Sequence, residues 1–274
     1  MNKILLETTN LKKSFEHVNG RITLFENINL KIKEGDLIAL VGPSGSGKSS
    51  LLHLLALLDK PTKGEVILNN KQTKNLSDGQ RDEIRRKYIS IIFQDNNLLT
   101  DFTALENVMM PLIINNETKN TIKEKSKKIL RDVKILNRSN HFPKELSGGE
   151  QQRVQLARVL AQVWSPLVDG TAKWIFLDEP VSSLDISYQL EVMNIMQNYA
   201  YRGGGVLTIM HDLNLTAMYA DNVGLLHNGK LLCFGTPSQV MNDKILSEAY
   251  SCKIKVNKTP KNGKIFILPQ ATNT

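Results

Sequence analysis

The stretch Gly42-Pro43-Ser44-Gly45-Ser46-Gly47-Lys48-Ser49 decides the fold of this chain. It matches the phosphate-binding pattern G-x-x-x-x-G-K-[ST] in full. The apolar run Leu37–Val41 precedes it, and a helical pattern over Ser50–Leu58 follows it. This order predicts a strand, a glycine-rich loop and a helix, with backbone N–H groups of the loop surrounding phosphate oxygens. Lys48 is then expected to reach the β- and γ-phosphates, and Ser49 to bind Mg²⁺.

A second stretch of small residues, Leu146-Ser147-Gly148-Gly149-Glu150, precedes another helical pattern. Paired glycines let a ligand approach the backbone closely. A helix that begins there offers free N–H groups and the positive end of its dipole to an anion. The alternative is that Ser147 simply caps an ordinary amphipathic helix. The stretch alone leaves both interpretations open.

Two neighbouring acids follow the apolar run Trp174–Leu177, which predicts a buried strand. Asp178 stands where a carboxylate can hold Mg²⁺ through water. Burying the Glu179 carboxylate beside it costs free energy, because two like charges then lie together. This arrangement is understandable if one acid binds the metal and the other takes a proton from water. The alternative is a strand that ends in a charged turn, which the upstream phosphate loop makes less attractive.

Two further apolar runs also end in polar residues. Ile89–Phe93 leads to Gln94, and Val206–Met210 leads to His211. A lone Gln or His is usually structural, but ligands gather at the carboxyl ends of strands in α/β sheets. Both side chains are therefore candidates for the same site. Asp185 is expected to cap a helix that begins directly after it.

The rest of the chain supports a mixed α/β protein. Ile4–Thr9 alternates like an edge strand, Phe15 is placed in a polar loop, and Lys253–Leu268 is expected to form a hairpin. From about residue 96 to 145 helical patterns replace strands. Residues 119–138 carry eight Lys or Arg against two acids, which favours a solvated helix face over a nucleic-acid patch that also lacks aromatics.

Composition narrows the class of protein. The 274 residues are 41% hydrophobic and carry a net charge of 35 − 27 = +8. The longest apolar run, near Leu51–Leu58, is too short to cross a bilayer, so a membrane role would need a partner. Cys233 and Cys252 lack metal-binding spacing and are expected to be reduced thiols.

Taken together, these stretches resemble the nucleotide-binding subunit of ABC transporters over residues 3–250. Leu146–Glu150 is the most specific part, because this signature separates the family from other phosphate-loop ATPases. The resemblance implies an α/β fold: a phosphate-loop NTPase core with an antiparallel β subdomain and an inserted α-helical subdomain. It implies a single domain over residues 1–274. Its parts would be a RecA-like core with the β subdomain (1–95 and 165–250), the helical subdomain (96–164) and a C-terminal tail (251–274).

The resemblance also implies ATP and Mg²⁺ as cofactors, and it gives each motif a role. Glu179 would be the general base, and His211 would contact the γ-phosphate. Gln94 would touch the metal and the attacking water, while Ser49 and Asp178 complete the Mg²⁺ site. The residues expected around ATP are Phe15, which would stack on adenine, and Gly42, Pro43, Ser44, Gly45, Ser46, Gly47, Lys48, Ser49 and Ser50.

In this family the signature acts on the partner's nucleotide. Ser147, Gly148, Gly149 and Glu150 would therefore bind ATP held by a second copy of the chain, in a head-to-tail dimer. Asp185 would cross the same interface. The other implied partner is a transmembrane permease, which places the chain peripherally on the cytoplasmic face of the bacterial inner membrane.

Different parts of the chain resemble different groups within the family. Up to about residue 145, Arg85–Asn97 and Thr103–Val108 are similar to lipoprotein-releasing and macrolide-exporter ATPases. From about 150 to 256, Leu167–Lys173 and His211–Ala220 are similar to haem (hemin) importer ATPases. This favours a mosaic joined near the signature, with a single divergent protein as the alternative. Because the permease-binding groove falls in the first part, lipoprotein release is the main interpretation, and haem or iron-chelate import the alternative.

Two other classes of protein fit less well. Nucleic-acid-maintenance ATPases with this signature place a long coiled coil between the Gln and the signature. Here only 146 − 94 = 52 positions separate the two motifs, without sustained heptads. A non-catalytic scaffold is not favoured either, because Lys48, Glu179 and His211 are all present. No nucleic-acid partner is therefore expected.

Overall fold

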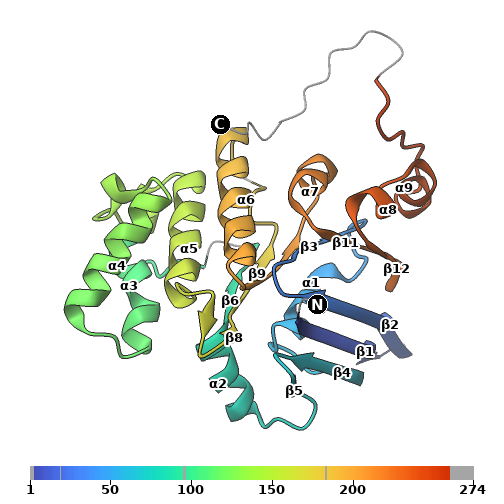
Figure 1. Cartoon of the computed structure of the whole chain (residues 1–274), viewed down its shortest axis with the longest axis horizontal. Coiled ribbons are helices and arrows are strands. Elements are labelled where there is room, and N and C mark those ends of the chain that lie inside the picture. Colours follow the sequence, from blue (N-terminus) through green and yellow to red (C-terminus); the bar gives the residue numbers. More distant parts are fainter. Residues whose placement is uncertain (1–2, 19, 95–96, 183, 260–274) are drawn as a thin grey trace.

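The computed structural model describes residues 3–18, 20–94, 97–182 and 184–259. A six-stranded sheet, with strand order β12-β11-β3-β10-β9-β6, forms its centre. A four-stranded sheet, with order β2-β1-β4-β5, lies beside it (Figure 1). The third sheet is a small hairpin of two strands, β7 and β8. The predicted α/β fold with an antiparallel β subdomain is confirmed.

The strands have these bounds: β1 Ile4–His17, β2 Gly20–Lys33, β3 Leu37–Val41, β4 Lys63–Leu68, β5 Lys71–Gln72, β6 Ile89–Ile92, β7 Leu167–Val168, β8 Thr171–Ala172, β9 Trp174–Asp178, β10 Gly205–Ile209, β11 Asn222–His227 and β12 Lys230–Gly235. The α-helices are α1 Lys48–Leu55, α2 Asp78–Tyr88, α3 Ala104–Ile114, α4 Lys119–Asp132, α5 Gly148–Gln162, α6 Ile186–Tyr201, α7 Leu213–Tyr219, α8 Pro237–Val240 and α9 Asp243–Ala249. Two short 3₁₀ helices lie at Leu136–Arg138 and Pro143–Glu145.

The central strands are buried on both faces, which is why they are continuous apolar runs. Successive side chains of a strand point to opposite faces. Ile38 and Leu40 of β3 accordingly join a core with α1 and the four-stranded sheet. Ala39 and Val41 join the other core, with α5, α6 and α7. The six-stranded sheet therefore separates two hydrophobic cores.

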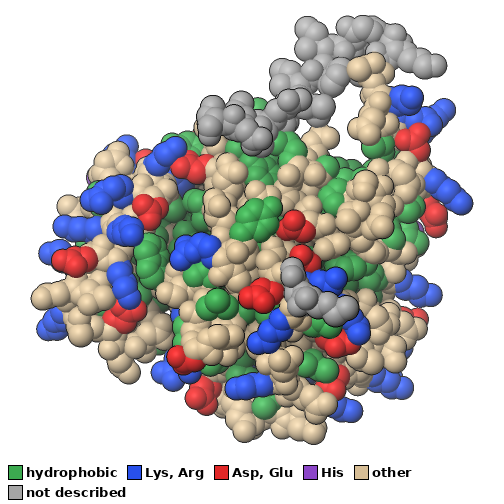
Figure 2. All heavy atoms as spheres, viewed as in Figure 1, with side chains coloured by type: hydrophobic (Ala, Val, Ile, Leu, Met, Phe, Trp, Pro, Cys, Tyr) green, Lys and Arg blue, Asp and Glu red, His purple; other side chains and the backbone are tan. Residues whose placement is uncertain are grey.

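The helices α3, α4 and α5 form the region to the left of the sheet in Figure 1. Helix α4 buries Ile122, Ile129 and Leu130, which follow helical spacing. Its lysines and Arg131 lie on the opposite, mostly exposed side, and Figure 2 shows Lys and Arg side chains gathered over this edge of the molecule. The basic run is therefore a solvated helix face.

Three expectations about the chain ends differ from the structure. Strand β1 is not an edge strand, because it lies between β2 and β4 and is antiparallel to both. It also extends to His17, so Phe15 is in a strand paired with Ile22 rather than in a loop. The hairpin expected at Lys253–Leu268 finds no strand over residues 253–259, and its remainder lies outside the described residues.

Within the described ranges, none of the helices combines the length and the apolar character that crossing a membrane requires.

Candidate functional site

The phosphate loop connects the carboxyl end of β3 to the start of α1, as predicted. Gly47 caps α1 in the left-handed conformation, with φ of 97°, and provides no side-chain cap. Gly42 is pressed against β11: a Cβ atom there would lie 2.0 Å from the carbonyl oxygen of Leu226. Glycine is therefore required where the loop leaves the sheet. The hydroxyl oxygen of Ser46 is buried and meets no hydrogen-bond partner in the described chain.

Lys48 is buried against its own loop. Its Nζ donates hydrogen bonds to the carbonyl oxygens of Gly42, at 2.8 Å, and Pro43, at 2.9 Å. Burial lowers the pKa of Lys48, while the charges of Glu179 and Asp178 oppose that shift. An ammonium group held this way has two neutral acceptors, so an arriving phosphate would be a stronger, charged acceptor for it.

Asp178 ends β9 beside the start of α1. It is 5% exposed, and its Oδ1 is buried with no hydrogen-bond partner among the described residues. Burial raises the pKa of Asp178, and a hydrogen bond from the Ser49 side chain acts against that rise. An unpaired buried carboxylate oxygen next to a hydroxyl is a donor set that suits a hard cation such as Mg²⁺. The predicted metal-binding pair, Ser49 and Asp178, is thus brought together.

Glu179 and His211 meet at the same end of the sheet. His211 Nε2 lies 2.6 Å from Glu179 Oε1, across two parallel neighbouring strands, β9 and β10. Glu179 has a positive φ of 53°, which is uncommon for a residue with a side chain. The backbone therefore turns at this residue. Its side chain is 19% exposed, so solvent can reach the carboxylate.

Gln94 and Asp185 lie near this edge, but within the described part of the chain neither has a hydrogen bond or ion pair to Glu179 or His211. Gln94 follows β6, the strand beside β9, and its side chain is exposed. Asp185 is the N-cap of α6 and accepts a hydrogen bond from the amide of Tyr188 at 3.1 Å. Its expected cap is confirmed. The Ser182 hydroxyl donates to the carbonyl oxygen of Glu179, which ties this turn to β9.

Phe15 lies on the four-stranded sheet, and the residue is 48% exposed. The ammonium of Lys13 is 4.7 Å from the ring centroid, within cation–π range. Lys13 is in turn paired with Asp59 at 2.6 Å and donates to the carbonyl oxygen of Lys60. One face of the ring is thus backed by a fixed cation.

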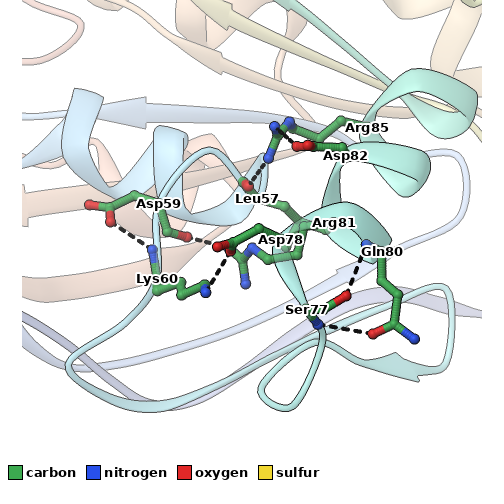
Figure 3. A network of polar contacts seen from close by, with 9 residues as sticks. All are labelled: Leu57, Asp59, Lys60, Ser77, Asp78, Gln80, Arg81, Asp82 and Arg85. Atoms are coloured by element: carbon green, nitrogen blue, oxygen red, sulfur yellow. Dashed lines mark hydrogen bonds and ion pairs between the residues drawn. The ribbon is translucent and has the colours of Figure 1, made fainter.

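The segment that holds Lys13 is itself fastened to α2 (Figure 3). Arg85 donates to the carbonyl oxygen of Leu57 at 2.7 Å, and Arg81 to that of Asp59. Lys60 pairs with Asp78 at 2.5 Å. The end of α1, the strand that carries Phe15 and helix α2 are therefore joined in one polar network. Lys13 and Phe15 are two positions apart in one strand, so the sequence pattern could have predicted that they share a face. No pattern in the sequence could have predicted the contact of Asp59 with Lys13.

The signature stretch begins α5, away from the phosphate loop. Ser147 accepts a hydrogen bond from the Glu150 amide at 3.3 Å, and the Ser147 amide donates to Glu150 at 2.8 Å. Glu150 also pairs with Arg138 at 2.9 Å. The amide of Ser147 first, and then its hydroxyl and Arg138, lower the pKa of Glu150 against the effect of burial. The described residues contain no hydrogen bond or ion pair that links residues 147–150 to residues 42–49.

Comparisons with known proteins agree with this geometry. A family model described as "ABC transporter" matches residues 25–182. A hemin import ATP-binding protein from Roseobacter denitrificans is 44% identical over 254 residues, which is 93% of this chain and 95% of that protein. One from Bartonella henselae is 39% identical, over 92% of this chain and 93% of that protein. A dimeric ATP-binding cassette, solved in a post-hydrolysis state with ADP and Pi, has a TM-score of 0.77 and 32% identity; the match spans 85% of this chain and 99% of that one.

These relatives correct the interpretation of the chain as a mosaic. One group, the hemin import proteins, aligns along more than nine-tenths of the chain, so two halves of different origin find no support. Neither does a lipoprotein-releasing first half. The full-length alignments, the family match and the strand-end site lead to one conclusion: the chain belongs to the ABC transporter family, as an ATP-hydrolysing cassette of such a transporter.

Proposed function

We propose that this chain is the ATPase subunit of a haem importer. The observation that carries the proposal is the near-complete alignment with hemin import ATP-binding proteins. Haem or a closely related iron chelate would be carried by the permease, not by this chain. The proposal takes up the alternative drawn from the sequence rather than lipoprotein release.

The residues at the sheet edge support ATP hydrolysis. We expect Lys48 to exchange the carbonyl oxygens of Gly42 and Pro43 for phosphate oxygens, because a charged acceptor binds ammonium more strongly. Glu179 would take a proton from the attacking water, and His211 would hold that carboxylate in place beforehand. Mg²⁺, held by Ser49, Gln94 and, through water, Asp178, would neutralise phosphate charge. Adenine would stack on the ring face of Phe15 that Lys13 does not occupy.

A second copy would complete each site. Ser147 and Glu150 hydrogen-bond to each other in a capping box. A Cβ atom on Gly148 would meet open space, and one on Gly149 would meet only the Leu184 side chain, at 3.7 Å. This stretch therefore presents an accessible backbone to a phosphate approaching from outside. In a head-to-tail dimer that phosphate would belong to ATP bound by the partner's Lys48. Asp185, at the start of α6, would lie at the same interface.

The permease would dock beside the helical subdomain. A groove of about 580 Å³ lies between α2, β6, α3 and α5. Leu58, Leu99 and Ile114 line it and are 40%, 40% and 52% exposed. Arg85, Arg86 and Arg158 lie among them. An amphipathic permease helix with apolar and acidic side chains would fit this lining. Binding there would hold the chain peripherally at the cytoplasmic face of the inner membrane, with residues 96–164 as the subdomain that meets the permease.

Reconstitution tests the substrate directly. The purified chain would be combined with a haem permease, and separately with a lipoprotein-releasing permease, in lipid vesicles. We expect co-purification with the haem permease only, and haem accumulation that depends on ATP and is lost in Lys48→Ala. Stable assembly with the lipoprotein-releasing permease instead would refute haem import while leaving the ATPase assignment intact.

A further inference from the structure

The residue that ends α9 reaches the phosphate loop through its hydroxyl group. The backbone N–H of Gly42 donates a hydrogen bond to the Oη of Tyr250 at 3.1 Å, across 208 positions of sequence. Tyr250 follows α9 and lies outside the residues 25–182 matched by the family model. We propose that Tyr250 is a positioning residue for ATP binding, which sets the first peptide of the phosphate loop.

The Gly42 amide needs this partner because the sheet no longer supplies one. Strand β3 pairs with β11 up to Val41 and Leu225, and Gly42 lies one residue beyond. Gly42 is buried and pressed against the backbone of Leu226, which keeps water from its amide. A buried N–H without an acceptor is costly, so the Tyr250 hydroxyl satisfies a group that the fold has left unpaired.

The effect would reach the nucleotide through Lys48. The peptide group that follows Gly42 supplies one of the two carbonyl oxygens that hold Lys48 Nζ, at 2.8 Å. The N–H and the carbonyl of Gly42 belong to successive peptide groups that meet at its Cα, so holding the N–H restrains the point from which the carbonyl extends. Tyr250 would therefore set the resting position of Lys48 without touching ATP. This is a role in positioning and not in the chemical step.

The hydroxyl is itself held firmly. The amide of Tyr250 donates to the carbonyl oxygen of Leu246 at 3.0 Å, and its ring packs against the larger core. The chain after it folds back on α9: Ser247 Oγ accepts from the Ile254 amide at 2.9 Å, and Asp243 accepts from the Val256 amide at 2.8 Å. Burial raises the pKa of Tyr250, so the group stays a neutral hydroxyl. Because the Tyr250 side chain is held in this way, its hydroxyl keeps the Gly42 amide in one place.

The test compares two Tyr→Phe variants of the full chain. Y250F removes the acceptor of the Gly42 amide. Y199F is the matched control, since Tyr199 is 4% exposed and its hydroxyl has no hydrogen-bond partner in the described part of the chain. For Y250F we expect a roughly tenfold higher KM for ATP with kcat little changed, as for lost ground-state positioning. Y199F is expected to keep both constants.

Amide hydrogen exchange adds a readout that needs no turnover. The Gly42 amide of nucleotide-free Y250F is expected to exchange roughly tenfold faster than in the wild type or Y199F. Equal KM and equal Gly42 exchange in the two variants would overturn the inference, and so would a fall in kcat at unchanged KM. The inference rests on the phosphate-loop assignment, but not on haem. Lys48→Ala separates the two, because retained activity there would refute the loop assignment itself.

Discussion

Helices α1 and α5 both begin at glycine-rich stretches, and each offers backbone amides to a phosphate. They begin differently. Helix α1 starts at Gly47, with no side-chain cap and no acid in its first turn, next to the buried Lys48. Helix α5 starts at Ser147 with a complete capping box, in which Glu150 already occupies the Ser147 amide.

The difference shows what each helix can receive. The start of α1 combines free amides, a helix dipole and an ammonium group, which together suit a highly charged ligand. The start of α5 carries its own carboxylate and supplies hydrogen bonds rather than net positive charge. It is therefore suited to a phosphate whose charge is already neutralised by another lysine, which a head-to-tail dimer would provide.

The largest loss of ATPase activity is expected from a change at the sheet edge, where Glu179 lies. Glu179→Gln should lower the ATPase rate about a hundredfold to ten-thousandfold, because a general base is lost while ATP binding is kept. ATP should then trap a dimer that size-exclusion chromatography detects. A variant that stays monomeric in ATP would speak against the shared site.

Removing the cation of α1 comes next. Lys48→Ala should lower the ATPase rate about a hundredfold to a thousandfold, as losing a preorganised charge in a buried site does. Lys127→Ala, on the exposed face of α4, is the matched control and should keep its rate. Comparable losses in the two variants would mean that general charge, and not the phosphate loop, matters.

Mixing two inactive variants tests whether α1 and α5 act on the same ATP in different chains. Lys48→Ala and Ser147→Arg should each be inactive alone. A head-to-tail mixed dimer has one intact site, so an equal mixture should recover up to about a quarter of the wild-type rate. If the mixture remains as inactive as its components, Ser147 does not act on the neighbour's nucleotide.

The smallest effect concerns the cap of α5 and its dependence on pH. The Ser147 amide, and after it the Ser147 hydroxyl and Arg138, lower the pKa of Glu150. A lowered pKa means that the folded state favours the carboxylate, so this stabilisation is complete above the ordinary Glu pKa and is lost as the pH falls through the folded value. Glu150→Gln can still complete the capping box but loses the charge, so it should cost roughly 0.5 kcal/mol in the free energy of unfolding at pH 7.

Thermal unfolding of both proteins between neutral and acidic pH provides the measurement. The stability difference should shrink as the pH falls. A constant difference across that range would mean that the charge of Glu150 is unimportant. Helix α1 has no acid in its first turn, so the start of that helix is expected to add no comparable dependence of stability on pH.

The sequence predicted that three polar side chains lie at one edge of the sheet, because the topology forces them together. Asp178, Glu179 and His211 each follow an apolar run, and parallel neighbouring strands bring such positions together. The bounds of β3 and the start of α6 also followed, from the apolar run Leu37–Val41 and from the cap at Asp185. What the sequence could not supply were contacts between distant segments. Asp59 reaches Lys13 across 46 positions, and neither residue belongs to a local pattern that names the other.

The two-part interpretation of the chain had a related cause. It rested on short stretches such as Arg85–Asn97, and a likeness over a dozen residues carries little information about the origin of the whole chain. Alignment over the whole chain uses far more positions. Hemin import proteins align with more than nine-tenths of the chain.

The contact between His211 and Glu179 has a consequence for how the carboxylate is oriented. His211 Nε2 lies 2.6 Å from Oε1, which is one of the two carboxylate oxygens of Glu179. The side chain is 19% exposed, so the second oxygen is the one that a water molecule would meet. The imidazole thus selects which oxygen of the carboxylate faces solvent and which faces the neighbouring strand.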